Sequence, residues 1–175
     1  GVVISASHNP YEDNGIKLFG PDGYKLSETQ EAEIEAMILA AADDEEDRHE
    51  KPIGIVDRIE TAAEDYLAFL RGAMPAHFLL NGYRIVIDCA NGATSNTARR
   101  LLETWEPDLV VLHDKPNGTN INRDCGSEHT DALRQAVIEE KADLGVAFDG
   151  DGDRMIAIDE TGRILSGDQI LAIGA

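Results

Sequence analysis

The sequence has few cysteines, few aromatic residues and no long apolar run. Its 2 cysteines, Cys89 and Cys125, stand far apart in no metal-ligand spacing, so we interpret them as two reduced thiols of a cytoplasmic protein. No apolar stretch approaches the roughly 18 residues that indicate a membrane span, and no signal peptide is visible. We therefore expect no membrane partner, and Cys89, which ends an apolar run, is predicted to be a small core residue.

Basic residues are also scarce, because 15 Lys and Arg face 34 Asp and Glu, which gives a net charge of −19. Such a chain repels nucleic acid phosphates and anionic lipids, so we expect neither as a partner. An anionic ligand would need a local cluster of Lys, Arg, His or metal.

The 42% hydrophobic content is ordinary for a globular protein, and a chain of 175 residues is long enough to bury a core.

Neither end of the sequence resembles a natural terminus. The chain opens directly in Val2-Val3-Ile4, and it stops within the apolar run Ile170–Ile173, which has the pattern of an unfinished helix. Natural termini are usually polar and poorly ordered. We therefore expect a chain cut from a longer polypeptide.

The first fifty residues predict a small set of elements followed by a tether. In order along the chain, we expect a buried strand, a polar loop, a hairpin around a Gly-Pro-Asp-Gly turn, a helix with a capping box and an acidic linker. These are Val2–Ser5, Ser7–Gly15, Ile16–Phe19 with Tyr24–Leu26, the helix from Ser27 to Ala41, and Asp43–Glu50. The linker is a plausible domain boundary.

The remainder alternates apolar strands with helices. The strands expected are Ile53–Ile59, Arg84–Cys89, Leu109–Leu112, Leu144–Phe148, Met155–Asp159 and Arg163–Leu165. The helices expected are Thr61–Arg71, which opens on a second capping box, Ala93–Thr104 and Thr130–Lys141. Nearly all-apolar strands are buried on both faces, so the pattern predicts an α/β fold with a mixed, mostly parallel sheet and covering helices.

The loop Asp149-Gly150-Asp151-Gly152-Asp153-Arg154 directly follows an apolar strand. Loops at the carboxyl ends of parallel strands are where α/β proteins place their sites. Three carboxylates at alternate positions, separated by glycines that permit tight turns, can surround one hard cation and leave positions for water or substrate. Asp149, Asp151 and Asp153 are therefore predicted to bind Mg²⁺.

A calcium loop is a rival interpretation of the same stretch. Asp149, Asp151, Asp153 and Glu160 occupy positions 1, 3, 5 and 12 of the EF-hand pattern. However, Arg154 stands where that pattern requires glycine, and strands rather than helices are expected on both sides.

A second motif, Ser5-Ala6-Ser7-His8-Asn9-Pro10, also follows a strand. A serine in such a loop can carry a phosphoryl group, although the same residues would ordinarily form a turn. Ser7 and His8 are not expected to form a hydrolase pair, because neighbouring side chains at the end of an extended strand point to opposite sides.

Together the two motifs resemble the α-D-phosphohexomutase superfamily, with the same order and approximate separation. Within it the chain is most similar to the phosphoglucosamine mutases, chiefly in Asn117–Asn122 followed by Cys125-Gly126-Ser127. The resemblance covers essentially the whole chain. It implies an isomerase that interconverts glucosamine 6-phosphate and glucosamine 1-phosphate through a bisphosphate, and phosphomannomutase, phosphoglucomutase and a non-catalytic metal-binding module are the alternatives.

The resemblance also implies residue roles. Ser7 matches the serine that is phosphorylated and that contributes to Mg²⁺ binding with Asp149, Asp151 and Asp153. Lys17 and His8 match positions near the reacting hydroxyl, with Lys17 the better acid/base candidate, and Arg154 matches a position near the phosphate. His49, His77, His113 and His129 have no paired ligand spacing and are interpreted as structural or surface residues.

By the same resemblance, residues 1–50 belong to the end of a first domain, 51–165 form a second, and 166–175 begin a third. The domain boundaries imply that the isolated chain lacks mutase activity, since parts that recognise the substrate are missing. The implied partner is a phosphorylated hexosamine, and a homo-oligomer of the parent enzyme is possible.

Overall fold

A computed structural model describes residues 1–41 and 54–174 of the chain. The chain divides into two compact units, Gly1–Ile4 with Ile16–Ile59, and Ser5–Gly15 with Glu60–Ala175. The predicted linker Asp43–Glu50 lies outside the described residues. No helix among those residues is long and apolar enough to cross a membrane.

The first unit contains a strand pair and a helix. Strands β1 (Val2–Ser5) and β2 (Gly15–Leu18) form a two-stranded sheet, and Gly1 and Phe19 exchange two backbone hydrogen bonds of 2.7 and 2.8 Å at its end. The segment predicted to be the second hairpin strand forms only an isolated bridge between Phe19 and Lys25. The predicted burial of β1 is also wrong, since Ile4 is 72% exposed.

The two predicted capping boxes have different outcomes. Ser27 and Gln30, before and within α1 (Glu28–Ala41), exchange hydrogen bonds in both directions, of 3.1 and 3.4 Å, as predicted. At α2 (Ala62–Gly72), Thr61 instead donates its hydroxyl to Asp65 at 2.8 Å. Thr61 has helical backbone angles rather than the extended angles of a capping residue, so its side chain makes no cap.

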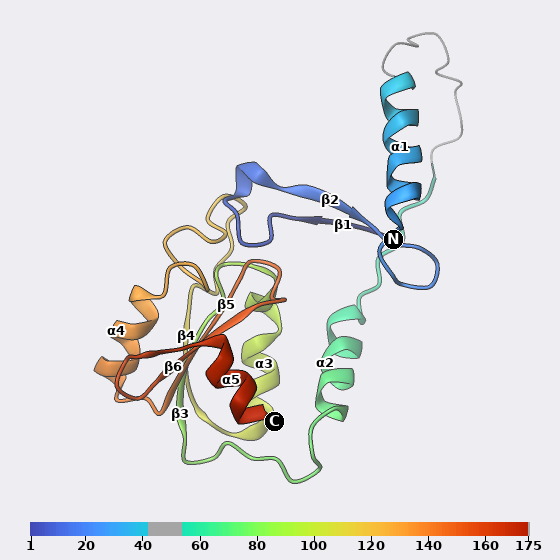
Figure 1. The fold of residues 1–175 in the computed structure, drawn as a ribbon. Coiled ribbons are helices and arrows are strands. Elements are labelled where there is room, and N and C mark those ends of the chain that lie inside the picture. Colours follow the sequence, from blue (N-terminus) through green and yellow to red (C-terminus); the bar gives the residue numbers. More distant parts are fainter. Residues whose placement is uncertain (42–53, 175) are drawn as a thin grey trace. The chain divides into compact units, whose positions relative to one another are not determined.

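The second unit is built on a five-stranded sheet of order β4-β3-β5-β6-β7 (Figure 1). Its strands are β3 (Arg84–Asp88), β4 (Asp108–Leu112), β5 (Leu144–Phe148), β6 (Met155–Asp159) and β7 (Ile164–Leu165). β3 pairs in parallel with β4 and β5, whereas β6 is antiparallel to β5 and β7. All strands except β6 therefore run in one direction, which confirms the predicted mixed, mostly parallel sheet.

Helices cover both faces of this sheet, with α4 (Asp131–Glu140) on one side and α3 (Ala98–Leu102) on the other (Figure 1). Val86 packs with Leu133 and Val137 beneath α4, while Ile85 and Ile87 join the cluster beneath α3. Burying one such side chain contributes roughly 1.5–3 kcal/mol. Because alternate residues of β3 are buried on opposite faces, its three central residues, Ile85–Ile87, are all apolar.

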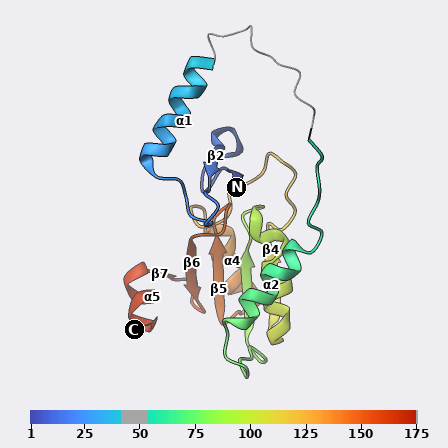
Figure 2. The same ribbon diagram turned by 90° about the vertical axis from the view of Figure 1, so that its right-hand side faces the viewer.

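Two predicted elements differ from the structure. Residues 93–104 form a 3-10 turn (Ala93–Asn96), then α3, then a second 3-10 turn (Glu103–Trp105), because Thr97, with φ −120°, interrupts the helix. Residues 54–59, the described part of the predicted strand Ile53–Ile59, have no regular structure, and Ile55 is 91% exposed. Figure 2 shows β7 and α5 (Gly167–Gly174) beyond β6 at one edge of the sheet.

Candidate active site

The loop Asp149–Arg154 joins β5 to β6 at the carboxyl end of the parallel strands. Asp149 is fully buried, and its Oδ1 accepts the N–H groups of Gly152 and Arg154, each at 3.1 Å. Gly152 has φ +76°, a conformation that glycine adopts readily. The backbone of the loop is therefore wound around the Asp149 carboxylate.

The carboxylates of Asp149, Asp151 and Asp153 each offer an oxygen, and these oxygens lie within 4.8 Å of one another. Oδ2 of Asp149 is buried and accepts no hydrogen bond from the residues that the structure describes. Burial raises the pKa of Asp149; the Arg154 N–H lowers it, and the neighbouring Asp151 and Asp153 carboxylates raise it. A divalent cation would satisfy the buried oxygen and offset this repulsion, so the residues fit a hard metal ion.

The loop that carries Ser7 is bonded directly to this carboxylate group. Ser5 donates its hydroxyl to Oδ2 of Asp151 at 3.0 Å and accepts the Ser7 N–H at 3.0 Å. Ser7 has a left-handed backbone, with φ +51°. The structure thus brings the two motifs together, although Ser5 and Asp151 are 146 residues apart in the sequence.

Ser7 and His8 lie closer than the sequence predicted. The Ser7 Oγ and His8 Nδ1 atoms are 3.5 Å apart, at the limit of a hydrogen bond. The expectation that the two side chains point to opposite sides is wrong, because it assumed an extended backbone and Ser7 is left-handed.

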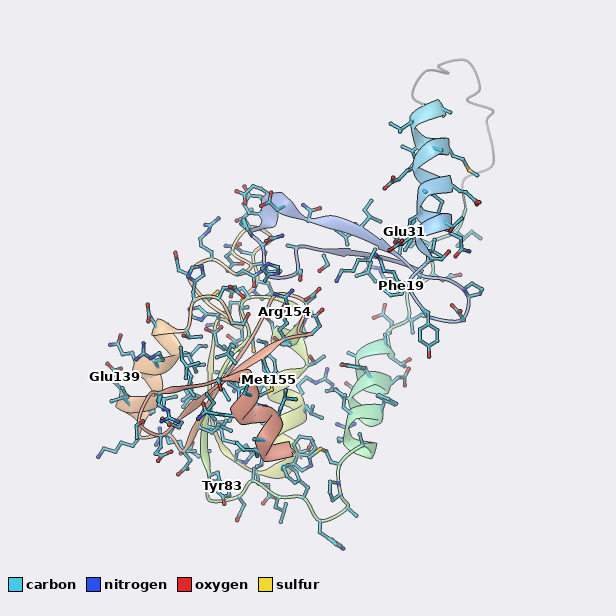
Figure 3. The ribbon with its side chains drawn as sticks, in the orientation of Figure 1. Phe19, Glu31, Tyr83, Glu139, Arg154 and Met155 are labelled. Atoms are coloured by element: carbon cyan, nitrogen blue, oxygen red, sulfur yellow. The ribbon has the colours of Figure 1, made fainter. Side chains whose placement is uncertain are left out.

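The two predicted basic residues have different positions. Arg154 lies where β6 begins, at the end of the sheet opposite to Tyr83 (Figure 3), and its Nε is 4.0 Å from Oδ1 of Asp153. Its side chain is 54% exposed and accessible to a ligand. Lys17 lies on β2 in the first unit, and its role stays a prediction.

The register of β5 and β6 excludes the calcium loop. Phe148 pairs with Met155 at one end of the hairpin, and Leu144 pairs with Asp159 at the other. Glu160 directly follows Asp159 and therefore lies five residues, or roughly 16 Å, along the strand direction from Met155. It cannot complete the ligand set of Asp149, Asp151 and Asp153.

Asn122, to which the sequence motifs assign no role, lies against the serine loop. Its amide nitrogen donates to the carbonyl oxygens of Ser7 and Asn9, each at 2.8 Å. Asn122 belongs to the stretch that marked the resemblance, but only the fold brings it to residues more than a hundred positions away. A cavity of about 310 Å³ beside it is lined in part by His8, Arg123 and His129.

A second group, Asp88, His113 and Cys125, also has atoms close enough to share a metal ion. The carboxylate of Asp88, however, already accepts the N–H groups of Ala90 at 2.8 Å and Gly126 at 3.1 Å and lies 3.0 Å from Nδ1 of His113. We interpret the group as a junction of loops, in agreement with the structural role expected of His113.

Both cysteines are free thiols, and both are buried, although burial was expected only of Cys89. Burial raises the pKa of Cys89 to about 11 and that of Cys125 to about 12. Cys89 packs in the cluster beneath α3, which confirms it as a small core residue.

Comparison with known families agrees with this geometry. Residues 64–162, more than half of the chain, match the family model described as phosphoglucomutase/phosphomannomutase, alpha/beta/alpha domain II. Residues 1–45 match the corresponding domain I. The chain belongs to the phosphoglucomutase/phosphomannomutase family.

Similar relatives within the family include phosphoglucosamine mutases. That of Syntrophobacter fumaroxidans is 49% identical over 173 residues, which cover 99% of this chain and 38% of the relative. That of Allorhizobium ampelinum is 49% identical over 180 residues, again covering 99% of this chain and 38% of the relative. The chain thus spans about 38% of the length of these relatives.

Solved structures of the family share the fold. A phosphoglucomutase/phosphomannomutase family protein of Burkholderia thailandensis has a TM-score of 0.78 at 26% identity, covering 99% of this chain and 36% of its own. An Aspergillus fumigatus N-acetylphosphoglucosamine mutase, solved with glucose 1,6-bisphosphate, has a TM-score of 0.61 at 20% identity and supports the fold alone. It covers 99% of this chain and 46% of its own.

Proposed function

We propose that a full-length protein carrying this chain interconverts glucosamine 6-phosphate and glucosamine 1-phosphate. The observation that carries the proposal is the hydrogen bond from Ser5 to Asp151, because it joins the Ser7 loop to a three-carboxylate loop that fits a metal ion. The 49% identity to phosphoglucosamine mutases supports the choice of substrate over mannose and glucose phosphates.

In the proposed reaction, the phosphoryl group of phosphorylated Ser7 passes to the free hydroxyl of the sugar phosphate. The bond between phosphorus and Ser7 Oγ breaks, a new bond to the sugar oxygen forms, and the hydroxyl proton goes to a base, Lys17 or His8. This gives glucosamine 1,6-bisphosphate. The bisphosphate then reorients, the bond between its other phosphorus and the sugar oxygen breaks, and a bond from that phosphorus to Ser7 Oγ forms. The base returns its proton to the freed sugar oxygen, which leaves the isomerised product and phosphorylated Ser7.

The described residues of the site would mainly position groups and offset charge, which is what phosphoryl transfer requires. Arg154 carries an accessible guanidinium beside Asp153 that would face phosphate oxygens. Asp149, Asp151 and Asp153, with an oxygen of phosphorylated Ser7, would hold Mg²⁺, whose preference for several hard oxygen ligands fits this donor set. When bound, the ion would neutralise negative charge on the phosphoserine.

The proposal includes the organisation and location expected from the sequence. Residues 1–50 and 51–165 would belong to the first and second family domains, and 166–175 would begin the third. Two free buried thiols are typical of a reducing compartment, which supports a cytoplasmic location.

The test is turnover and Ser7 phosphorylation in the full-length protein with Mg²⁺. The wild type is expected to convert glucosamine 1-phosphate faster than mannose 1-phosphate or glucose 1-phosphate, and mass spectrometry should find phosphate on Ser7. Ser7→Ala should lose at least about a thousandfold in kcat, since it removes the covalent carrier. The matched variant Ser27→Ala, at the start of α1, should retain activity.

The outcomes separate the alternatives. A preference for mannose or glucose phosphates would show that the protein is a phosphomannomutase or a phosphoglucomutase instead. Full activity of Ser7→Ala, with no phosphate on Ser7 in the wild type, would show that Ser7 is not the phosphoryl carrier. No turnover by the wild type would favour the non-catalytic metal-binding module.

A further inference from the structure

We infer that Asn122 is a positioning residue that clamps the Ser7 loop against the carboxylate loop and so sets the direction of the Ser7 hydroxyl. The catalytic consequence rests on the function proposed above. The clamp itself rests on hydrogen bonds, burial and close packing within the second unit.

Asn122 uses its amide nitrogen fully on the serine loop. Its Nδ2 donates to Ser7 O and to Asn9 O, both at 2.8 Å, and these two carbonyls flank His8. The residue is 8% exposed, so water is largely excluded from both bonds. An amide nitrogen has two hydrogens, and the geometry gives each one an acceptor.

The clamp is itself fixed to the sheet. The Asn122 N–H donates to Ala90 O at 2.9 Å, directly after β3, and Asn122 has φ +57°. A few residues later, Ser127 N donates to the Phe148 carbonyl at 3.0 Å, at the end of β5. Asparagine tolerates the left-handed conformation better than most residues, so the local backbone also favours it here.

Gly150 brings the carboxylate loop into the same contact. A Cβ atom at Gly150 would lie 2.4 Å from Ser7 O, 2.7 Å from the Asn122 Nδ2 and 2.8 Å from the Ile121 Cδ1. Two of these atoms, Ser7 O and Asn122 Nδ2, are joined to each other by a clamp bond, so neither can move away without stretching it. The Ser7 carbonyl, the Asn122 amide and the backbone between Asp149 and Asp151 are therefore packed at one point.

The clamp explains how Ser7 keeps its conformation. A left-handed backbone is disfavoured for serine, and it persists only where the surrounding contacts determine it. Holding the Ser7 and Asn9 carbonyls fixes the peptide planes on either side of His8. Without the clamp the loop can relax, and the direction of Ser7 Oγ is no longer fixed.

The decisive variant is Asn122→Asp in the full-length protein with Mg²⁺. It keeps the shape and the tolerance of positive φ, but it replaces both donor hydrogens by an oxygen that repels the two carbonyls. Asn122→Gly removes the side chain without adding charge or backbone strain. Asn117→Asp is the matched control, because Oδ1 of Asn117 accepts the N–H and the hydroxyl of Thr119, and a carboxylate retains both bonds.

Two measurements decide the inference. Both Asn122 variants should lower kcat by roughly tenfold to a hundredfold with KM changed less than about threefold, because misplacement by about 1 Å has effects of this order on rate. Asn117→Asp should match the wild type. Amide hydrogen exchange of Ser7 and Asn9 should accelerate at least about tenfold in the Asn122 variants, with the rest of the sheet unchanged.

Each outcome has a distinct meaning. Asn122 variants with wild-type kcat and unchanged exchange at Ser7 and Asn9 would overturn the clamp. Accelerated exchange with unchanged kcat would overturn the positioning role. A wild type without turnover or Ser7 phosphorylation would overturn the proposed function and the catalytic role of the clamp, while exchange would still decide whether Asn122 holds the loop.

Discussion

Asp88 shows how one buried carboxylate organises several loops. Its Oδ1 accepts Ala90 N, and its Oδ2 accepts Gly126 N and lies 3.0 Å from Nδ1 of His113. The loops that follow β3 and β4 are thereby joined beneath the candidate site. Asp88 is fully buried, so each lost bond would leave a donor without solvent to replace it.

We expect Asp88→Asn to lower the free energy of unfolding by about 2–4 kcal/mol, because an amide group presents a donor to N–H groups that need acceptors. Asp108→Asn is the control, since Asp108 is an exposed partner of Arg84 and should change stability by less than about 1 kcal/mol. Urea denaturation of both variants provides the measurement. Equal losses would contradict the role given to Asp88.

At the scale of single residues, spacing predicted Asp149, Asp151 and Asp153, because their cluster is local in the chain. It could not predict Asn122, whose partner Ser7 is 115 residues away. It also misjudged Ser7 and His8, because the positive φ of Ser7 follows from tertiary contacts rather than from its neighbours in the sequence.

Among the elements, the turn between β6 and β7 depends on one acidic residue. Oδ1 of Asp159 accepts Thr161 Oγ1 at 2.6 Å and the N–H groups of Thr161 and Arg163, each at 3.0 Å. The bond from the Thr161 hydroxyl and that from Arg163 N–H lower the pKa of Asp159, with smaller contributions from Thr161 N–H and the Arg163 charge.

A lowered pKa in the folded state means that Asp159 stabilises the turn above the ordinary carboxyl pKa, and that this contribution is lost as the pH falls through the folded pKa. Asp159→Asn should therefore be less stable than the wild type at neutral pH, and the difference should shrink below about pH 4. Thermal unfolding across that range tests this. A difference independent of pH would show that the charge of Asp159 contributes nothing.

The sequence predicted the bounds of the strands better than it predicted whether a helix is continuous. The ends of β3, β4 and β5 fall within one residue of the expected positions, because unbroken apolar runs mark strands buried on both faces. The helix expected over 93–104 is interrupted at Thr97, and its first residue, Ala93, donates its N–H to the Gly150 carbonyl, a long-range bond that no local pattern reveals. Residues 54–59 are apolar enough for a strand, but they lie in no sheet.

On the scale of the whole molecule, the chain spans about 38% of the length of its relatives. We expect the 175 residues alone to show no mutase turnover in a coupled assay that detects the full-length protein. The residues present would supply the proposed serine and carboxylates, but a net charge of −19 repels a phosphorylated sugar unless further basic residues bind it. Robust turnover by this chain would contradict that view.

The same isolated chain should still bind Mg²⁺. Saturating Mg²⁺ at about a hundred times its Kd should stabilise it by about 2.7 kcal/mol in chemical denaturation, and Asp149→Asn should abolish the effect. Absence of stabilisation in the wild type would show that the carboxylate loop needs the rest of the enzyme.

The Ser7 loop, residues 5–15, packs in the second unit, although most of β1 and β2 on either side of it belongs to the first. A genetic crossover within residues 54–59 would therefore take the loop from one parent and its clamp from the other. The fit at Gly150 leaves no space for an added methyl group, so a change on either side demands a matching change on the other. Natural selection should consequently preserve the two segments as a co-inherited pair, and viable recombinants between distant relatives should be rare at this boundary.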